Sequence, residues 1–286
     1  MSIFIVTTGI LLSLTLLFYL FWLLAFRRKS MSAVPALAYH HVQEKAGFPA
    51  TKLTFAKFEA QMLALKERGY RALSPDAFLR AAGTGADKSV FITFEDSYES
   101  VTREALPLLR SLEYTALIFV VSNYIGKPSE WDVRFCCSDH MTHEQIRRAL
   151  DAGFFLGSHT KTHPDLTTLS PQRLREELTG SKKALEDAFG REVKHLSYPF
   201  GRYNRRVMAM AQEAGYTAAF TINRPLFAAR FNALAVPMVG VYTVDSLRNF
   251  LCKVERGPFV WILDVRDKFI NRFASGTALI KGGRPA

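Results

Sequence analysis

The chain has 286 residues, enough for one large α/β domain with a sizeable core or for two small domains. Hydrophobic residues make up 49% of the sequence, as in an ordinary globular protein, and the formal net charge is +11. A charge of this sign favours anionic partners, such as a lipid headgroup surface or an acidic glycan. The basic residues are scattered and no nucleic-acid-binding motif occurs, so the sequence argues against a nucleic-acid-binding protein. The cysteines show no metal-binding spacing.

The first segment of the chain, Ile3–Phe26, contains no charged residue. A helix of this length would reach about 36 Å, which is enough to cross a bilayer. A cleavable signal peptide is the alternative, but the run is too long, no basic residue precedes it and no small-residue cleavage site follows it. We therefore expect residues 1–29 to form a single-pass anchor in the cell (inner) membrane. The basic residues that follow, Arg27–Lys29, favour a cytoplasmic main domain by the positive-inside rule, although three charges leave the side of the membrane open.

Strands and helices alternate after the anchor. The expected strands are Ala36–Tyr39, Val90–Phe94, Ala116–Val121, Phe154–Gly157, Leu196–Tyr198, Ala218–Ile222 and Val236–Tyr242. The expected helices are Thr54–Arg68, Ser100–Leu112, Thr142–Ala152, Ser170–Phe189, Asn204–Ala214 and Ser246–Val254. Pro107 lies inside one of these helices, where proline is poorly tolerated, so we expect a kink or an early turn there. Strands separated by helices predict βα units and a mainly parallel sheet or barrel.

This pattern also sets the domain boundaries. Residues 30–256 hold the alternating elements, and residues 257–286 form a basic, aromatic tail. We expect the tail either to pack on the main domain as a helix or to lie along a membrane surface as an interfacial helix.

Chemically active residues follow the predicted strands directly. They are His40-His41, Glu95-Asp96, His159 and Pro199-Phe200-Gly201. In parallel α/β folds, sites lie at the carboxyl ends of the strands, so we expect these residues to share one end of the sheet.

Two histidines four residues apart, His159 and His163, can face the same way and bind one metal ion. This spacing alone often occurs by chance on a surface, but Asp96 at another strand end could supply an oxygen ligand. Two histidines and one carboxylate with open positions suit a metal that activates water.

Several stretches together resemble the polysaccharide deacetylase family (carbohydrate esterase family 4, the NodB homology domain). These stretches are FITFEDSYES, LIFVV, MTHEQIRRALDAGFFLGSHTKTHPDLTTL, HLSYPFGRYN and AGYTAAFT. The opening ALAYHHV and the segment YPFGRYN are most similar to the branch of poly-β-1,6-N-acetylglucosamine deacetylases. The resemblance runs from about Pro35 to Asn223. It implies a deformed (β/α) barrel that hydrolyses an N-acetyl group on an amino sugar with the help of a metal.

The resemblance also implies roles for single residues. Its metal ligands would be Asp96, His159 and His163, its general base Glu95 and its general acid His40. We favour His40 as the acid over the adjacent His41, which could instead be a turn residue. The sugar groove would be lined by Tyr198, Pro199 and Phe200, and the backbone N–H of Phe200 would help to hold the oxyanion. The metal would be Zn²⁺, although Co²⁺ or Ni²⁺ would also fit these ligands.

The sequence departs from the family pattern in three places. Glu95 stands where the family has aspartate, Ser97 stands where glycine usually follows, and no histidine occurs after His195. A displacement of about 1 Å at a catalytic group can cost about a hundredfold in rate, and serine would be strained if that position needs a positive φ. We still expect Glu95 to work as a base whose pKa the metal holds low. The alternatives are a non-catalytic homologue that binds glycan or metal, and a deacylase or deformylase of an amino sugar on a lipid carrier.

The remaining candidates are weaker. Trp131, next to Asp132, could line the sugar site or serve only in packing. We expect His140 and His143 to be solvated and His195 to be structural. The partners expected from the sequence are an N-acetylated glycan and a membrane, with no indication of oligomeric state.

Overall fold

The computed structural model describes residues 13–16, 19, 34–45, 50–82, 88–130, 138–222, 231–257 and 260–281. Among these residues, no helix is long and apolar enough to cross a membrane. The anchor predicted over residues 1–29 lies almost wholly outside them, as does Trp131, so both stay predictions.

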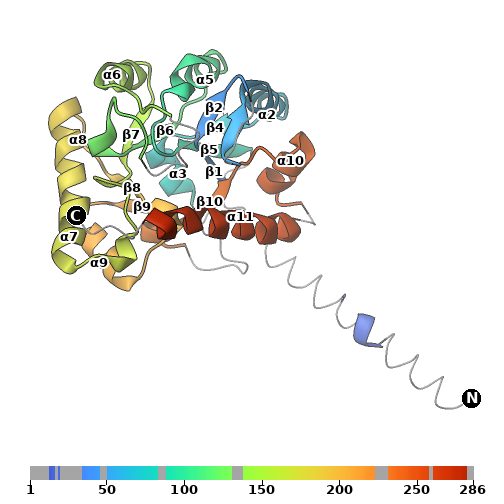
Figure 1. The fold of residues 1–286 in the computed structure, drawn as a ribbon. Helices are drawn as coiled ribbons and strands as arrows, with labels where there is room; N and C mark the ends of the chain where they lie inside the picture. The colour runs from blue at the N-terminus through green and yellow to red at the C-terminus, as the bar shows by residue number, and fades with distance from the viewer. Residues whose placement is uncertain are drawn as a thin grey trace, which may run out of the picture.

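Within the described residues, seven parallel strands close into a barrel (Figure 1). In chain order they are β1 (Ala36–Tyr39), β5 (Ser89–Phe94), β6 (Leu117–Val120), β7 (Phe155–Ser158), β8 (His195–Ser197), β9 (Ala218–Thr221) and β10 (Val236–Gly240). Strand β1 pairs with β10 on one side and with β5 on the other, and this second pairing closes the ring. The deformed (β/α) barrel predicted from the sequence is thereby confirmed.

Three short strands lie outside the ring. Strand β4 (Arg71–Ala72) pairs with the start of β5, and β2 (His41–Gln43) pairs with β3 (Lys52–Thr54) in a separate sheet. The sequence analysis did not anticipate them.

Helices surround the barrel (Figure 1). They are α2 (Phe55–Glu67), α3 (Pro75–Ala81), α4 (Ser100–Arg103), α5 (Ala105–Ser111), α6 (His143–Asp151), α7 (Pro171–Arg175), α8 (Ser181–Phe189), α9 (Arg205–Glu213), α10 (Leu247–Glu255) and α11 (Val260–Lys281). A π-helical turn, η3 (Glu176–Gly180), joins α7 to α8, and the short 3-10 turns are η1 (Ser122–Tyr124), η2 (Leu166–Thr168), η4 (Pro199–Gly201) and η5 (Ala233–Ala235). A capping box starts α6, where the Thr142 hydroxyl accepts from the N–H of Gln145 and the Gln145 side chain accepts from the N–H of Thr142.

The break expected near Pro107 is present. The segment Ser100–Leu112 forms two helices, α4 and α5, separated at Glu104, where φ is −129°. Pro107 occupies the first turn of α5, where its missing N–H costs the helix no hydrogen bond. The chain therefore breaks before the proline and starts a new helix that tolerates it.

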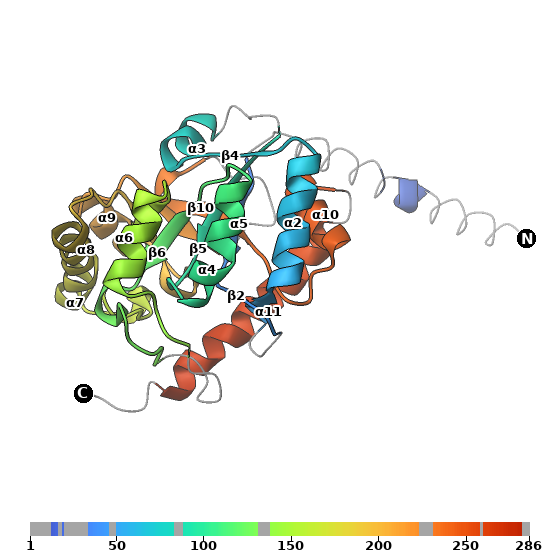
Figure 2. The ribbon, with the colours of Figure 1, turned by 90° about the horizontal axis from the view of Figure 1, so that it is seen from above.

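The amino end of the barrel is filled with aromatic rings. Phe91, Phe119 and Phe220 point inward, and Phe78 of α3 stacks on Phe91 with ring centroids 4.4 Å apart. Gly157 faces the same interior, where a Cβ atom would lie 2.6 Å from the Phe119 ring. Figure 2 shows α3 at this end of the barrel and α11 at the other. The apolar core thus occupies one end and leaves the carboxyl end for polar side chains.

Candidate metal centre

Strand β5 points one carboxylate into the barrel. Residues two apart on a strand face the same side, so Glu95, at the end of β5, continues the inward row of Phe91 and Thr93. On β8 the same alternation places Ser197 above His195. The two rows meet inside the barrel, where the Ser197 hydroxyl donates to Glu95 Oε2 at 2.5 Å.

Three potential metal ligands converge at this end of the barrel. Asp96 Oδ1 lies 3.4 Å from His159 Nε2 and 3.4 Å from His163 Nε2, and the three ligand atoms lie within 4.8 Å of one another. Ligands about 2.1 Å from one shared ion lie roughly 3.0–3.4 Å apart in octahedral or tetrahedral geometry, so the two distances from Asp96 Oδ1 suit a divalent cation. All three side chains are buried. The convergence predicted from strand ends and histidine spacing is present in the structure.

Burial and hydrogen bonding leave the histidines ready to bind a cation. Burial lowers the pKa of His159 to about 3 and holds the pKa of His163 well below its usual value, so both imidazoles are neutral. The Nδ1–H of His159 donates to the Ser197 carbonyl at 2.9 Å, which leaves the Nε2 lone pair for the metal.

The backbone around the ligands is in the left-handed region at several residues that are not glycine. The φ angles are 62° at Asp96, 52° at Ser97, 69° at Thr160 and 58° at His163. Such angles cost free energy and persist only where neighbouring contacts hold them. The concern that Ser97 occupies a position suited to glycine is therefore correct.

A stack of three rings supports the strained turn at Asp96. His41 stacks on Tyr98 at 3.5 Å, and Tyr98 stacks on His140 at 5.0 Å. His140 Nδ1 lies 2.6 Å from the carbonyl oxygen of Asp96, to which it donates, and the N–H of Met141 donates to the Ser97 carbonyl. The prediction of a solvated His140 was wrong, because the bridge between Tyr98 and His140 carries that ring inside.

The neighbouring histidines behave as follows. The sequence analysis raised a turn at His41, but this residue is buried and begins β2. His143 is exposed and His195 is buried at the amino end of β8, both in line with expectation.

A second support holds the loop between His159 and His163. One carboxylate, Glu177 of the π-helical turn, accepts hydrogen bonds from the N–H groups of Lys161 and Thr162 at 2.9 Å and from the Thr162 hydroxyl at 2.6 Å. These bonds offset the cost of the left-handed residues that turn both imidazoles to the same side. No local sequence pattern predicts this contact, because Glu177 resembles any other residue on a helix surface.

The environment of Glu95 suits proton transfer. Burial raises its pKa to about 8, and the hydrogen bond from Ser197 offsets part of that rise. Its Oε1 is buried and has no hydrogen-bond partner among the described residues. A cation at the Asp96 site would lower the pKa, because His159 Nε2 lies only 3.6 Å from Glu95 Oε2.

His40 follows β1 at the same end of the barrel. It is half-buried, its Nδ1 has no hydrogen-bond partner among the described residues, and burial lowers its pKa to about 4. A charge on His40 would lower the pKa of both His159 and His163, which places it close to them.

The segment proposed to line the sugar groove divides into two parts. Phe200 is half-buried, has a φ of 57° and meets the His163 ring edge-on at 4.7 Å. Tyr198 is 1% exposed, donates its hydroxyl hydrogen to the Leu234 carbonyl and stacks on Tyr203. Tyr198 and the buried Pro199 therefore support the segment from beneath, a correction to the expectation that they line the groove.

Comparison with known sequences identifies relatives of this chain. Residues 82–219 match the family model described as polysaccharide deacetylase. The protein YxkH of Bacillus subtilis (strain 168) is 31% identical over 191 residues, which cover 66% of this chain and 64% of that protein. The poly-beta-1,6-N-acetyl-D-glucosamine N-deacetylase of Staphylococcus aureus (strain MRSA252) is 23% identical over 229 residues, covering 71% and 77%. The chain spans between 48% and 64% of the length of three of the curated relatives it matches.

Solved structures agree on the fold. The deacetylase PplD of Streptococcus pyogenes, in complex with acetate, superposes with a TM-score of 0.67 at 25% identity, covering 77% of this chain and 97% of that one. IcaB from Ammonifex degensii gives a TM-score of 0.65 at 24% identity, with 79% and 97% covered.

Proposed function

We propose that this chain, whose residues 82–219 match the polysaccharide deacetylase family model, is a metal-dependent hydrolase that removes N-acetyl groups from an amino sugar. The substrate would be a polysaccharide, an oligosaccharide or a lipid-linked glycan. The observation that carries the proposal is the convergence of Asp96, His159 and His163 beside the buried carboxylate of Glu95. The activity in the name of the staphylococcal relative and the acetate in the PplD complex support the same chemistry.

Asp96, His159 and His163 would hold the divalent metal, with Zn²⁺ as our choice for an oxygen-and-imidazole ligand set. When bound there, such an ion polarises the amide carbonyl and acidifies a water molecule. The chain's own part is to keep both imidazoles neutral and turned to one side. Burial keeps both imidazoles neutral, the Ser197 carbonyl orients the ring of His159, and Glu177 orients both rings through the loop that carries them.

Glu95 is proposed as the general base. Its Oε2 is held by the Ser197 hydroxyl, and its buried Oε1 is available to accept the proton of the attacking water. The carboxylate on this longer side chain still accepts a hydrogen bond from the Ser197 hydroxyl.

The backbone N–H of Phe200 is proposed to stabilise the oxyanion of the tetrahedral intermediate. The N–H groups of the next two residues, Gly201 and Arg202, already donate to the carbonyls of Tyr198 and Pro199. The left-handed conformation of Phe200 turns the chain at this point, beside His163.

His40 is proposed to protonate the departing amine. With a pKa near 4 it rests as the neutral imidazole at pH 7, so it must receive a proton during the cycle before it can act as an acid. The proton that Glu95 takes from the attacking water is the proposed source, and a cation at the Asp96 site would lower the raised pKa of Glu95 and so make that proton easier to release.

An acetate-release assay tests the proposal. The purified protein, supplied with Zn²⁺, Co²⁺ or Ni²⁺ in turn, should release acetate from N-acetylglucosamine oligomers, and chelation should stop the release. Binding of metal with no release from any acetylated or formylated amino sugar would instead favour a non-catalytic homologue, the alternative raised by Glu95 and Ser97.

The anchor predicted over Ile3–Phe26 bears on the substrate. We propose an inner-membrane protein whose main domain is cytoplasmic, as the basic flank after the run favours. A reporter fused after Ala286 should then be active in the cytoplasm. Activity of an export-dependent reporter alone would reverse the orientation and favour an extracellular polymer.

A further inference from the structure

Helix α11 crosses the end of the barrel at which the strands finish. The Tyr242 hydroxyl donates to Asn271 Oδ1 at 2.5 Å, and the Asn271 amide donates to the Ile222 carbonyl at 3.5 Å. Ile222 directly follows β9, and Tyr242 lies just beyond β10. Helix α11 therefore lies at the end of the barrel where the candidate metal ligands converge, and Figure 2 shows it at the end opposite α3.

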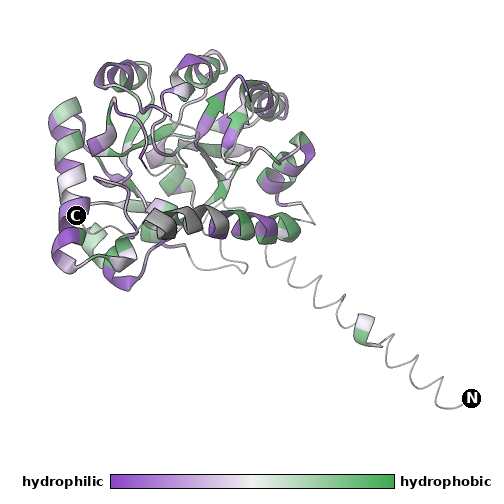
Figure 3. Cartoon of the chain, in the orientation of Figure 1, coloured by the Kyte–Doolittle hydropathy of each residue, from purple (hydrophilic) through white to green (hydrophobic). Residues whose placement is uncertain are grey.

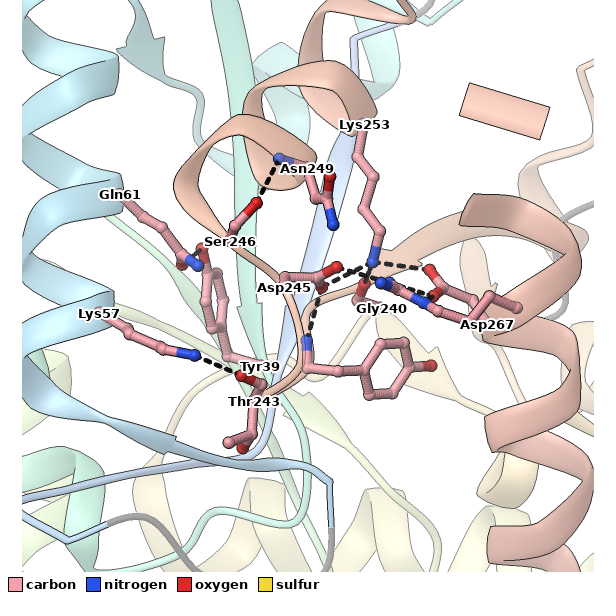
Figure 4. Close-up of polar contacts among 12 residues, drawn as sticks. Tyr39, Lys57, Gln61, Gly240, Thr243, Asp245, Ser246, Asn249, Lys253 and Asp267 are labelled. Carbon is pink, nitrogen blue, oxygen red and sulfur yellow. Dashed lines mark hydrogen bonds and ion pairs between the residues drawn. The ribbon is translucent and has the colours of Figure 1, made fainter. Parts of the chain in front are cut away.

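A buried ion-pair network fixes which face of α11 meets the barrel (Figure 4). Lys253 Nζ lies 2.7 Å from Asp245 Oδ2 and 2.7 Å from Asp267 Oδ2, and it also donates to the Gly240 carbonyl at 2.9 Å. Arg266 of α11 donates to the same two carboxylates. Because the side chain of Lys253 is only 1% exposed, separating these charges would be costly. The network thus sets the rotation of α11 about its own axis.

The opposite face of α11 carries exposed apolar side chains. We define the outer stripe as Trp261, Ile262, Val265 and Phe269, which are 44%, 49%, 44% and 63% exposed. The spacing of four from Trp261 to Val265 to Phe269 places these residues on one side of the helix. Figure 3 shows green, hydrophobic bands that alternate with purple, hydrophilic ones along α11. Exposed apolar side chains gathered on one side of a helix are typical of an interaction surface.

The charge around the outer stripe is positive. Lys268 and Arg272 lie three residues after Val265 and Phe269, on the same side of the helix. The acidic residues of the helix lie elsewhere, since Asp264 is buried and Asp267 bonds to Lys253. Aromatic and aliphatic side chains flanked by basic residues are typical of helices that lie in the headgroup region of an anionic membrane.

We propose that the outer stripe, with Lys268 and Arg272, docks on the surface of an anionic phospholipid bilayer. The chain's net charge of +11 and its uncharged run Ile3–Phe26 agree with this partner. Docking turns the end of the barrel that holds the metal centre toward the membrane. The proposal does not depend on the deacetylase activity.

Tryptophan fluorescence tests the docking on the full chain reconstituted in vesicles. Of the three tryptophans, Trp22 and Trp131 are replaced by phenylalanine, so that Trp261 is the one reporter. Phosphatidylcholine with brominated acyl chains, mixed with phosphatidylglycerol, should quench most of the Trp261 emission and shift it to the blue. Val265→Ser with Phe269→Ser should abolish the quenching, and Lys268→Gln with Arg272→Gln should remove its dependence on phosphatidylglycerol.

A second reporter serves as the matched control. Phe155 is also exposed but starts β7, at the amino end of the barrel, so Phe155→Trp in a Trp261→Phe background should keep its emission. Quenching of the Phe155→Trp reporter with none at Trp261 would overturn the proposal, and so would an unquenched Trp261. A blue shift of the Trp261 emission that grows with protein concentration and does not depend on the lipid would instead assign the outer stripe to a contact with a second copy of the chain.

Discussion

Ser197 donates its hydroxyl hydrogen to Glu95 Oε2 at 2.5 Å, and its backbone carbonyl accepts the Nδ1 hydrogen of His159 at 2.9 Å. One residue of β8 therefore orients both the proposed base and a proposed metal ligand. Ser197→Ala removes only the first contact, so we expect kcat to fall by about tenfold to a hundredfold with the metal affinity little changed. Ser197→Thr, which keeps the hydroxyl, should recover part of the rate. Equal loss of bound metal and of rate in Ser197→Ala would contradict this division of roles.

The metal ligands can be tested without an assay of activity. His159→Ala or His163→Ala should each remove most of the bound metal, as measured by elemental analysis and calorimetric titration, because each leaves two ligands in place of three. His143→Ala is the matched control, since that ring is exposed and should leave the metal content unchanged. Full metal content in both ligand variants would show that the site lies elsewhere.

Glu95 allows a test of whether the site has adapted to the longer side chain. Glu95→Gln should lower kcat at least about a hundredfold, as expected for loss of a positioned base, with bound metal retained. Glu95→Asp should also be slower than the wild type, because the shorter carboxylate withdraws from the Ser197 hydroxyl. If the wild type were inactive and Glu95→Asp active, the residue would mark decay and the enzyme proposal would fall.

The role of His40 depends on the leaving group. An amine leaves only when protonated, whereas nitrophenolate leaves unaided, so His40→Gln should lose about a hundredfold on an N-acetylated sugar and far less on nitrophenyl acetate. The two substrates are compared by kcat/KM at one pH and one metal loading. Equal losses on both substrates would show that His40 positions the site and does not act as the acid.

The buried His195 should make the folded state less stable in acid. Burial lowers its folded-state pKa to about 4, while the unfolded value is about 6.5, so between these values the unfolded chain binds more protons. Stability is then lost as the pH falls from about 6.5 towards 4, by up to about 3 kcal/mol from this residue. His195→Phe should reduce the slope of unfolding free energy against pH, measured by urea denaturation, and the exposed His143→Gln should not. An unchanged slope in His195→Phe would contradict the assignment.

The sequence predicted the barrel well because its strands are buried apolar runs separated by capped helices. It also predicted that the acidic pair and the paired histidines meet at one end of the barrel, since both follow strands and a spacing of four residues is a local property. The short strands β2, β3 and β4 were missed, because two or three residues carry no readable period.

Support for the site was harder to foresee. His140 is bonded to the carbonyl of Asp96 across a separation of many residues, and Glu177 reaches the ligand loop from a neighbouring helix. Both residues are of types that are common on a surface helix or near its start, so the local sequence does not indicate these contacts. The left-handed angle at Ser97 was open from sequence, because it depends on contacts such as that from Met141.

The pairing of β1 with both β5 and β10 has a consequence for biosynthesis. Strand β1 leaves the ribosome early, but its partner β10 emerges only after the three proposed metal ligands, near the end of the domain. Until then the nascent sheet is open along one side of β1, with unpaired backbone groups that invite pairing with other chains. A chain truncated before Val236 would keep every proposed catalytic residue and still lack a closed barrel. Such a fragment should be prone to aggregation, and completion of the last strand is the step that protects the newly made protein.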